Sequence, residues 1–185
     1  TKKSIKMKLV LILLLNGCIA QSGNGDIIFD SSKSSSLKDW KVVNDGVMGG
    51  ISNSTIILNK EGNVEFKGIV STANNGGFAS IRYRFEKKFI KGRTTIKIRL
   101  KGDSKPYQFR VKSKSNDYYS YITTFSTSNK WETIEIALSD LFPSFRGYKL
   151  DQPNFESSSI EEISFLISNK KNEAFKLEID KIEIK

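Results

Sequence analysis

The stretch Thr-Ile-Lys-Ile-Arg-Leu-Lys, residues 95–101, alternates apolar and polar side chains without a break. Successive side chains of a strand point to opposite faces of a sheet. The three apolar residues therefore share one face, and the three cations Lys97, Arg99 and Lys101 share the other. This alternation predicts a half-buried β-strand.

The same period of two recurs along most of the chain, between short clusters of turn residues. Eight segments show it most clearly: 64–66, 79–85, 95–101, 107–111, 118–125, 134–138, 163–167 and 175–184. We expect about eight to ten strands in all. Helix is minor, and its best candidates are the short stretches 36–39 and 139–142. This pattern predicts an all-β fold with two packed antiparallel sheets, a β-sandwich or jelly roll.

Positive charge is concentrated in residues 87–114, which hold eleven Lys or Arg and a single acid, Asp103. If the strand 107–111 pairs with 95–101 as a hairpin, five cations gather on one sheet face: Lys97, Arg99, Lys101, Arg110 and Lys112. Such a face would bind a polyanion, for example an acidic glycan. The alternative is a solvated outer face. No nucleic-acid recognition motif is present, so we expect no nucleic acid as partner.

The composition excludes several kinds of catalytic and metal-binding site. The 185 residues include 30 Lys+Arg, 20 Asp+Glu and no His, a formal net charge of +10. Without His there is no Ser-His-Asp or Cys-His nucleophile and no His-containing metal site. The single cysteine, Cys18, leaves no internal disulfide or thiolate cluster. We expect one domain with no enzyme activity, no cofactor and no metal.

Residues 1–20 have the pattern of an export signal: several lysines, the apolar run 9–15 and then small residues up to Ala20. A membrane-spanning helix needs roughly twenty apolar residues, so we expect this segment to be removed. The Leu-Asn-Gly-Cys at 15–18 resembles a bacterial lipobox, which would lipidate Cys18 and give the only membrane association we expect. Alternatively, cleavage after Ala20 leaves a soluble protein. The mature, exported protein is then a polar connector, 21–26, and one domain, 27–185, in the cell envelope, the periplasm or outside the cell.

Two glycine-rich stretches are the most distinctive in the chain. Asn-Asp-Gly-Val-Met-Gly-Gly-Ile-Ser, residues 44–52, follows Trp40 closely, and Asn-Asn-Gly-Gly-Phe, residues 74–78, precedes the strand 79–85. Their glycines permit positive φ and close backbone approach, and their Asn and Asp residues shape turns. Neither stretch is a phosphate loop, because no Gly-Lys-Ser/Thr follows and no helix begins after the glycines.

These stretches resemble the complex I intermediate-associated protein family, whose members assist assembly of NADH:ubiquinone oxidoreductase. The matching parts are Trp40, 44–50, Ser52, Phe66, Gly68, 74–80, Arg82, Phe-Pro-x-Phe-Arg-Gly at 142–147 and the closing strand 175–184. The resemblance covers residues 27–184. It implies a galactose-binding-like β-sandwich and a non-catalytic, chaperone-like role in binding a protein client. The leader departs from it, because a mitochondrial member would carry a transit sequence in place of an export signal.

Two functions are therefore open: a client-binding module, or an extracytoplasmic carbohydrate-binding module. The candidate ligand-binding residues lie in or near the motif loops: Trp40, Asn44, Asp45, Met48, Asn74, Asn75, Arg82 and Arg146. Exposed aromatic residues suit glycans, and the candidates are Trp40, Trp131, Tyr118 and Tyr119, although core packing is the default for each Trp. Asp45 is better interpreted as a turn residue. A calcium site at Asn44, Asp45 and Asn74 has no diagnostic spacing.

Overall fold

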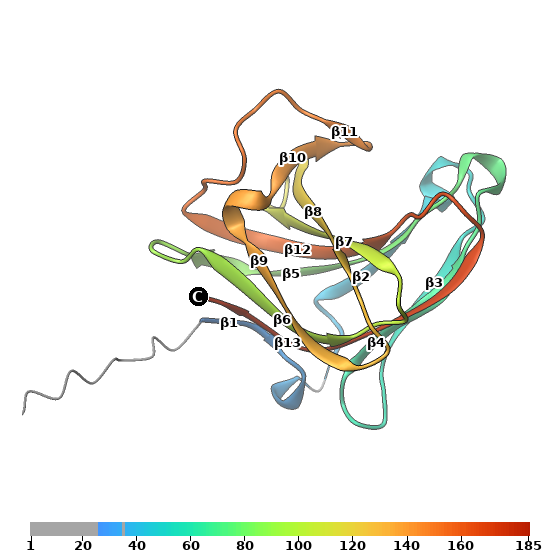
Figure 1. Cartoon of the computed structure of the whole chain (residues 1–185), viewed down its shortest axis with the longest axis horizontal. Helices are drawn as coiled ribbons and strands as arrows, with labels where there is room; N and C mark the ends of the chain where they lie inside the picture. Colours follow the sequence, from blue (N-terminus) through green and yellow to red (C-terminus); the bar gives the residue numbers. More distant parts are fainter. Residues whose placement is uncertain (1–25, 35) are drawn as a thin grey trace, which may run out of the picture.

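Two antiparallel sheets face each other across a shared apolar core in the computed structural model, which describes residues 26–34 and 36–185 (Figure 1). One sheet has six strands: β1 (Asp26–Asp30), β3 (Asn53–Leu58), β4 (Val64–Val70), β6 (Thr95–Lys101), β9 (Trp131–Ala137) and β13 (Glu173–Ile184). The other has seven: β2 (Trp40–Asn44), β5 (Ala79–Phe89), β7 (Pro106–Lys112), β8 (Ser120–Ser126), β10 (Phe142–Phe145), β11 (Tyr148–Lys149) and β12 (Ser159–Ile167). The predicted all-β sandwich is confirmed.

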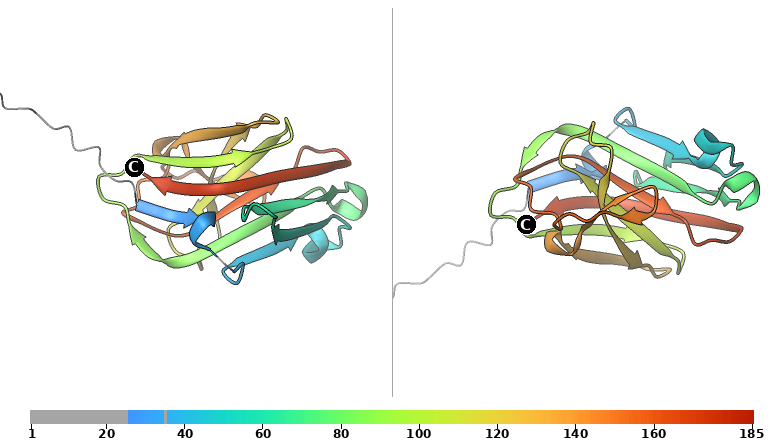
Figure 2. Two further views of the ribbon diagram at one scale, coloured as in Figure 1. Left: turned by 90° about the horizontal axis from the view of Figure 1, so that it is seen from below. Right: turned by 90° about the horizontal axis from the view of Figure 1, so that it is seen from above.

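The order of the strands shows a chain that crosses repeatedly between the sheets. The six-stranded sheet runs β3-β4-β13-β6-β9, with β1 pairing along β13, and the seven-stranded sheet runs β11-β10-β8-β7-β12-β5-β2. The view from below in Figure 2 shows β1 (blue) on one side of β13 (red) and β6 (green) on the other. Both sheets are antiparallel throughout.

Each of the eight segments with clear alternation coincides with a strand, although Tyr118 and Tyr119 precede β8 and Leu138 begins η4. Five further strands are present: β1, β2, β3, β10 and β11. No α-helix occurs in the described part of the chain, which has only the short 3₁₀ turns η1 (Ser31–Lys33), η2 (Asp45–Met48), η3 (Ala73–Asn75) and η4 (Leu138–Asp140). The expected helix at 139–142 overlaps η4, whereas 36–39 forms a turn before β2. The leader and Cys18 lie outside the described residues, so their assignment stays a prediction.

The expected hairpin of 95–101 with 107–111 is wrong. β6 pairs with β9 and β13, and β7 pairs with β8 and β12, so the two strands belong to different sheets. Both strands bury their apolar residues, and each does so from its own side of the core. The chain crosses at Gly102, where any Cβ would overlap the side chain of Thr127. The five cations therefore do not share one face.

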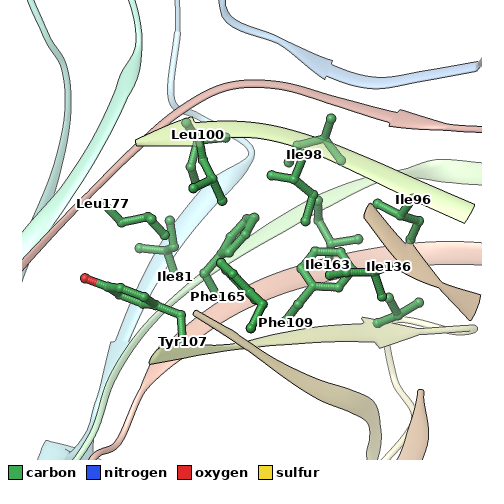
Figure 3. Packing of buried hydrophobic residues seen from close by; sticks show 14 of the residues in the cluster. Ile81, Ile96, Ile98, Leu100, Tyr107, Phe109, Ile136, Ile163, Phe165 and Leu177 are labelled. Atoms are coloured by element: carbon green, nitrogen blue, oxygen red, sulfur yellow. The ribbon is translucent and has the colours of Figure 1, made fainter. Parts of the chain in front are cut away.

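Large side chains from both sheets meet in the core. Figure 3 shows Ile96, Ile98 and Leu100 of β6 facing side chains of β7 and β12, among them Phe109, Ile163 and Phe165; all six are fully buried. The rings of Phe109 and Phe165 lie 5.4 Å apart. Because side chains alternate along a strand, the residues between these core positions on β5, β7 and β12 point to the outer face of the seven-stranded sheet.

We expect Phe109→Ala to lower the free energy of unfolding by about 3–5 kcal/mol, since it leaves a cavity in a core packed from both sides. Urea denaturation followed by fluorescence measures the change. Phe89, which is 74% exposed, supplies the control. Phe89→Ala should change stability by about 0.5 kcal/mol or less. Equal losses in the two variants would contradict this account of the core.

Candidate functional site

A groove of about 600 Å³ lies on the outer face of the seven-stranded sheet. Its floor comes from three adjacent strands: Ser80 and Arg82 of β5, Glu162, Ser164 and Leu166 of β12, and Gln108, Arg110 and Lys112 of β7. The register pairs Ser164 with Arg82 on one side and with Arg110 on the other. Directly paired residues share a sheet face, so this row of three runs across the groove floor.

Aromatic and apolar side chains border the groove at its two ends. Tyr118 is 62% exposed, and its ring packs edge-to-face against Phe145 of β10 with centroids 5.3 Å apart. The guanidinium of Arg146 lies over the Phe145 ring at 5.2 Å. Met48 of η2 and Phe78 line the groove from the motif loops. The groove thus combines a polar floor with exposed apolar borders.

The groove carries excess positive charge. Four basic residues line it, namely Arg82, Arg110, Lys112 and Arg146, and one acidic residue, Glu162. Glu162 is only 2% exposed and accepts a hydrogen bond of 2.6 Å from Nε of Arg84. The lining residues therefore have a net charge of +3, and their one carboxylate is already engaged.

Burial changes the titration of the groove cations. Desolvation, with a smaller contribution from the charge of Arg82, lowers the pKa of Arg110 to about 10. Desolvation also lowers the pKa of Lys112, although the carboxylate of Glu162 opposes the shift. Lys112 Nζ donates to the carbonyl oxygen of Asp117 at 2.6 Å. These shifts show that both cations are partly withdrawn from water and that nearby acidic groups do not fully offset the cost of this desolvation.

Both glycine-rich motifs meet at the carboxylate of Asp45, which is fully buried. It accepts hydrogen bonds from the backbone N–H of Ser52 at 2.9 Å, of Gly77 at 2.7 Å and of Phe78 at 3.2 Å, and from the hydroxyl of Ser52. Burial alone would raise the pKa of Asp45, but these hydrogen bonds outweigh it and hold the pKa below its ordinary value. Asp45 thus ties the loop 45–52 to the loop 73–78.

Two of the motif glycines are required by close approach to this carboxylate. A Cβ at Gly50 would overlap the carboxyl group of Asp45, and a Cβ at Gly76 would come within 2.7 Å of Asp45 Oδ2. Real Cβ atoms do not tolerate such contacts, so only glycine lets the two loops close around Asp45. The motifs therefore shape the end of the groove at which Met48 and Phe78 lie.

The structure brings three of the eight motif-loop candidates to the groove: Met48, Arg82 and Arg146. Trp40 is buried and packs against Phe29 and Tyr83, with ring centroids 5.2 and 4.8 Å away. Asp45 is buried between the loops 45–52 and 73–78, and Asn44 accepts a hydrogen bond from the Ser54 hydroxyl. Asn74 and Asn75 are exposed in η3 with positive φ and do not line the groove.

The five predicted cations divide between the two sheets. Arg110 and Lys112 lie in the groove, whereas Lys97, Arg99 and Lys101 belong to β6 of the other sheet. There Lys97 pairs with Glu135, and Arg99 pairs with Asp180 at 3.1 Å while lying 5.6 Å from the Trp131 ring. Carboxylates of the same sheet therefore offset much of the positive charge on β6.

Of the predicted glycan-facing aromatic residues, only Tyr118 lines the groove. Tyr119 is half-buried beside Tyr121, and Trp131 is half-buried on the six-stranded sheet. Sequence reasoning missed Glu162, Ser164, Gln108, Phe78 and Phe145 as groove residues. One signal was available, since Glu162 and Ser164 alternate with the apolar residues Ile163 and Phe165 and so share the face opposite to them.

Other candidate sites are weaker. A smaller hollow of about 420 Å³ lies between residues 90–94, 138–139 and 155–158, and none of the predicted site residues lines it. Residues 26–34 and 36–185 contain no cluster of three or more His, Cys, Asp or Glu side chains placed to hold a metal ion. Within the same residues, no helix is both long and apolar enough to cross a membrane.

A polar groove on one face of a β-sandwich defines a binding module. The chain belongs to the complex I intermediate-associated protein 30 (CIA30) family, which it matches over residues 29–179. This confirms the family that the glycine motifs indicated.

Solved structures share the fold. The chain is similar to the family 11 carbohydrate-binding module of the cellulosomal cellulase Lic26A-Cel5E of Clostridium thermocellum, with 19% identity and a TM-score of 0.67 over 87% of this chain and 94% of that one. The module from the same organism in complex with a β-1,3-1,4-mixed-linked tetrasaccharide gives 20% identity and a TM-score of 0.65 over 88% and 96%. An exo-β-agarase matches at 10% identity and a TM-score of 0.55 over 88% of this chain but 25% of its own.

We expect Asp45→Asn to destabilise the protein by about 3 kcal/mol at neutral pH, because the amide cannot accept all of the hydrogen bonds that the buried carboxylate accepts. The wild-type pKa is depressed, so this stabilisation is complete above the ordinary carboxyl value of 3.8 and is lost as the pH falls toward the lower folded value. Urea titrations from pH 7 down to pH 3 should show a decreasing difference between the free energies of unfolding of the wild-type protein and the variant. Asp151→Asn, at an exposed position, is the control. A difference in the free energy of unfolding that grows as the pH falls would contradict a lowered pKa for Asp45.

Proposed function

We propose that the protein is a non-catalytic glycan-binding module and that an oligosaccharide lies along the groove of the seven-stranded sheet. The observation that carries this proposal is the combination in one groove of a polar floor and the exposed Tyr118–Phe145 pair. Sugars present hydroxyl groups at their edges and apolar C–H faces. The hydroxyl groups can form hydrogen bonds with the serines, Gln108 and the arginines of the floor, and the apolar faces can pack on aromatic rings.

The carboxylates of the groove argue against glycoside hydrolysis. Most glycosidases use two carboxyl groups, one on each side of the scissile bond. Glu162 is the one carboxylate among the described groove residues, and it is buried and bonded to Arg84. A second acid to complete the pair does not line this groove.

The structural neighbours support this choice of ligand class. The family 11 module was solved with a mixed-linked tetrasaccharide, and its fold matches nearly the whole of this chain. At 20% identity the shared feature is the fold, so the neighbour does not identify the sugar. The sugar depends on the side chains that this chain places in its own groove.

We expect Tyr118→Ala and Phe145→Ala each to weaken binding of a groove-bound oligosaccharide about tenfold, the equivalent of 1.4 kcal/mol, because each removes apolar area that would cover a sugar face. Thermal-shift screening of neutral and acidic oligosaccharides identifies a ligand, and calorimetry measures its affinity for each variant. Phe89→Ala, away from the groove, is the matched control. Undiminished affinity in both groove variants would rule out this binding site, and a screen without any binding would rule out the function.

A second candidate function follows from the family and from one exposed feature. The 44–52 loop presents three apolar side chains to solvent: Val47 is 76%, Met48 55% and Ile51 59% exposed. Exposed apolar clusters of this kind mark protein-interaction sites. The alternative function is therefore client binding in assembly of NADH:ubiquinone oxidoreductase.

The alternative predicts that cells without the protein assemble less of this complex and that an Ile51→Ser variant, which changes the loop outside the groove, fails to restore it. Native gels stained for NADH dehydrogenase activity measure the assembled enzyme. Tyr118→Ala should restore assembly fully if the loop and not the groove binds the client. Normal assembly in the deletion strain would exclude this role.

A further inference from the structure

Two guanidinium groups flank one small side chain at the floor of the groove. Arg82 of β5 and Arg110 of β7 are the direct neighbours of Ser164 on the two sides of β12. Strands lie about 4.8 Å apart, so the Cα atoms of the two arginines are roughly 10 Å apart across the serine. Ser164 is buried at the floor of the groove, with 6% of its surface exposed, and its side chain is much shorter than those of its two neighbours. The row therefore places one cation on each side of a small polar side chain.

Neither of these arginines has an acidic partner among residues 26–34 and 36–185. Arg110 donates from Nε and Nη2 to a single neutral acceptor, Gln108 Oε1, at 3.2 and 2.7 Å, and Arg82 forms no ion pair. Other arginines of the same fold are matched with carboxylates, as Arg84 is with Glu162 and Arg99 with Asp180. Among the arginines of the described residues, the three without an ion pair are Arg82, Arg110 and Arg146, and all three line the groove.

The charges around this pair do not neutralise it. Glu162 lies one row away, where it pairs in register with Arg84 and Lys112 and bonds to the guanidinium of Arg84. Lys112 and Arg146 add further positive charge to the same lining. Withdrawal from water and repulsion by Arg82 both act on Arg110, whose pKa falls to about 10, yet it stays charged at neutral pH. Cations that are partly desolvated and lack a counter-ion form strong charge-assisted hydrogen bonds with an anion that binds beside them.

We propose that Arg82, Arg110 and Ser164 form an anion subsite and that the glycan bound in the groove is acidic, with its carboxylate or sulfate group seated between the two guanidiniums. This inference rests on the proposed glycan-binding function. Guanidinium groups bind planar carboxylates and sulfate oxygens through paired N–H donors. Ser164, paired in register with both arginines, would offer its hydroxyl as an additional donor. Tyr118 and Phe145 border the same groove and would cover the neighbouring sugar.

The test uses one oligosaccharide in a charged and an uncharged form. Tetragalacturonate and its fully methyl-esterified form share one sugar chain, and the ester replaces each carboxylate by a neutral methyl ester, while a sulfated galactan tetrasaccharide tests the other acid. Calorimetry at low salt should show the charged oligosaccharide binding wild-type protein at least tenfold more tightly than the ester. Arg110→Gln and Arg82→Gln should each remove most of that preference, and Arg99→Gln on the other sheet should leave it intact. A preference for the uronate over the sulfate, or the reverse, identifies the acid.

Stability separates a binding role from a structural one. Arg110 is a half-buried charge without a counter-ion, so Arg110→Gln should leave the Tm of the free protein unchanged or raise it, while affinity for the acidic oligosaccharide falls about 30-fold. A structural arginine would lower Tm when replaced. A drop in Tm of several degrees together with unchanged affinity would overturn the proposal.

The remaining outcomes separate the two proposals. If the esterified and mixed-linked oligosaccharides bind as tightly as the acidic ones, and Tyr118→Ala weakens them all, the glycan function stands and the anion subsite is wrong. If no oligosaccharide binds, both proposals fail. If a tetraglutamate peptide binds with the same dependence on Arg110 and the acidic sugars do not, the groove recognises an acidic protein, and the glycan assignment is overturned.

Discussion

The hydrogen bonds accepted by the buried carboxylate of Asp45 are the interactions on which the rest of the site depends. This carboxylate lies at the end of β2, and its hydrogen bonds reach the backbone just before β5 and, through Ser52, the start of β3. The Ser52 hydroxyl in turn bonds to the backbone of Ser71 after β4. One buried charge therefore joins strands of both sheets at the same edge of the sandwich. An unpaired buried carboxylate is costly, so the loops must close around it whenever the domain is folded.

The strand register then divides the side chains of the seven-stranded sheet between two tasks. On β12, Ile163, Phe165 and Ile167 point into the core, while Glu162, Ser164 and Leu166 form the groove floor. A slip of one residue would exchange these sets and bury two polar groups in the core. The apolar packing that stabilises the fold thus also sets the spacing of Arg82 and Arg110, because both are paired with Ser164.

Local alternation made the strands predictable, but pairing between them was not local. Residues 95–101 form β6 with the predicted limits and faces, yet the partner of β6 is decided by contacts with β9 and β13, far along the chain. The hairpin prediction failed for that reason. β1, β2, β3, β10 and β11 lacked a strong enough pattern to stand out, and nothing in the local sequence of β12 distinguished Glu162 and Ser164 as groove residues from its other polar residues, Ser159 and Glu161. Arg82 and Arg146 were found only because they lie close to the family motifs.

The residues that carry the family resemblance act largely within the protein itself. Gly50 and Gly76 both lie close against Asp45, and Trp40 packs in the core, so a match at these positions establishes the scaffold and says little about its ligand. Arg82 and Arg110 behave differently, since they leave charge without a counter-ion where a stable fold alone would favour neutral side chains. Unmatched charge in an otherwise well-satisfied sandwich is better explained by something that binds there than by the needs of folding. The ligand is therefore to be sought from the groove chemistry, with the family name as a guide to the fold.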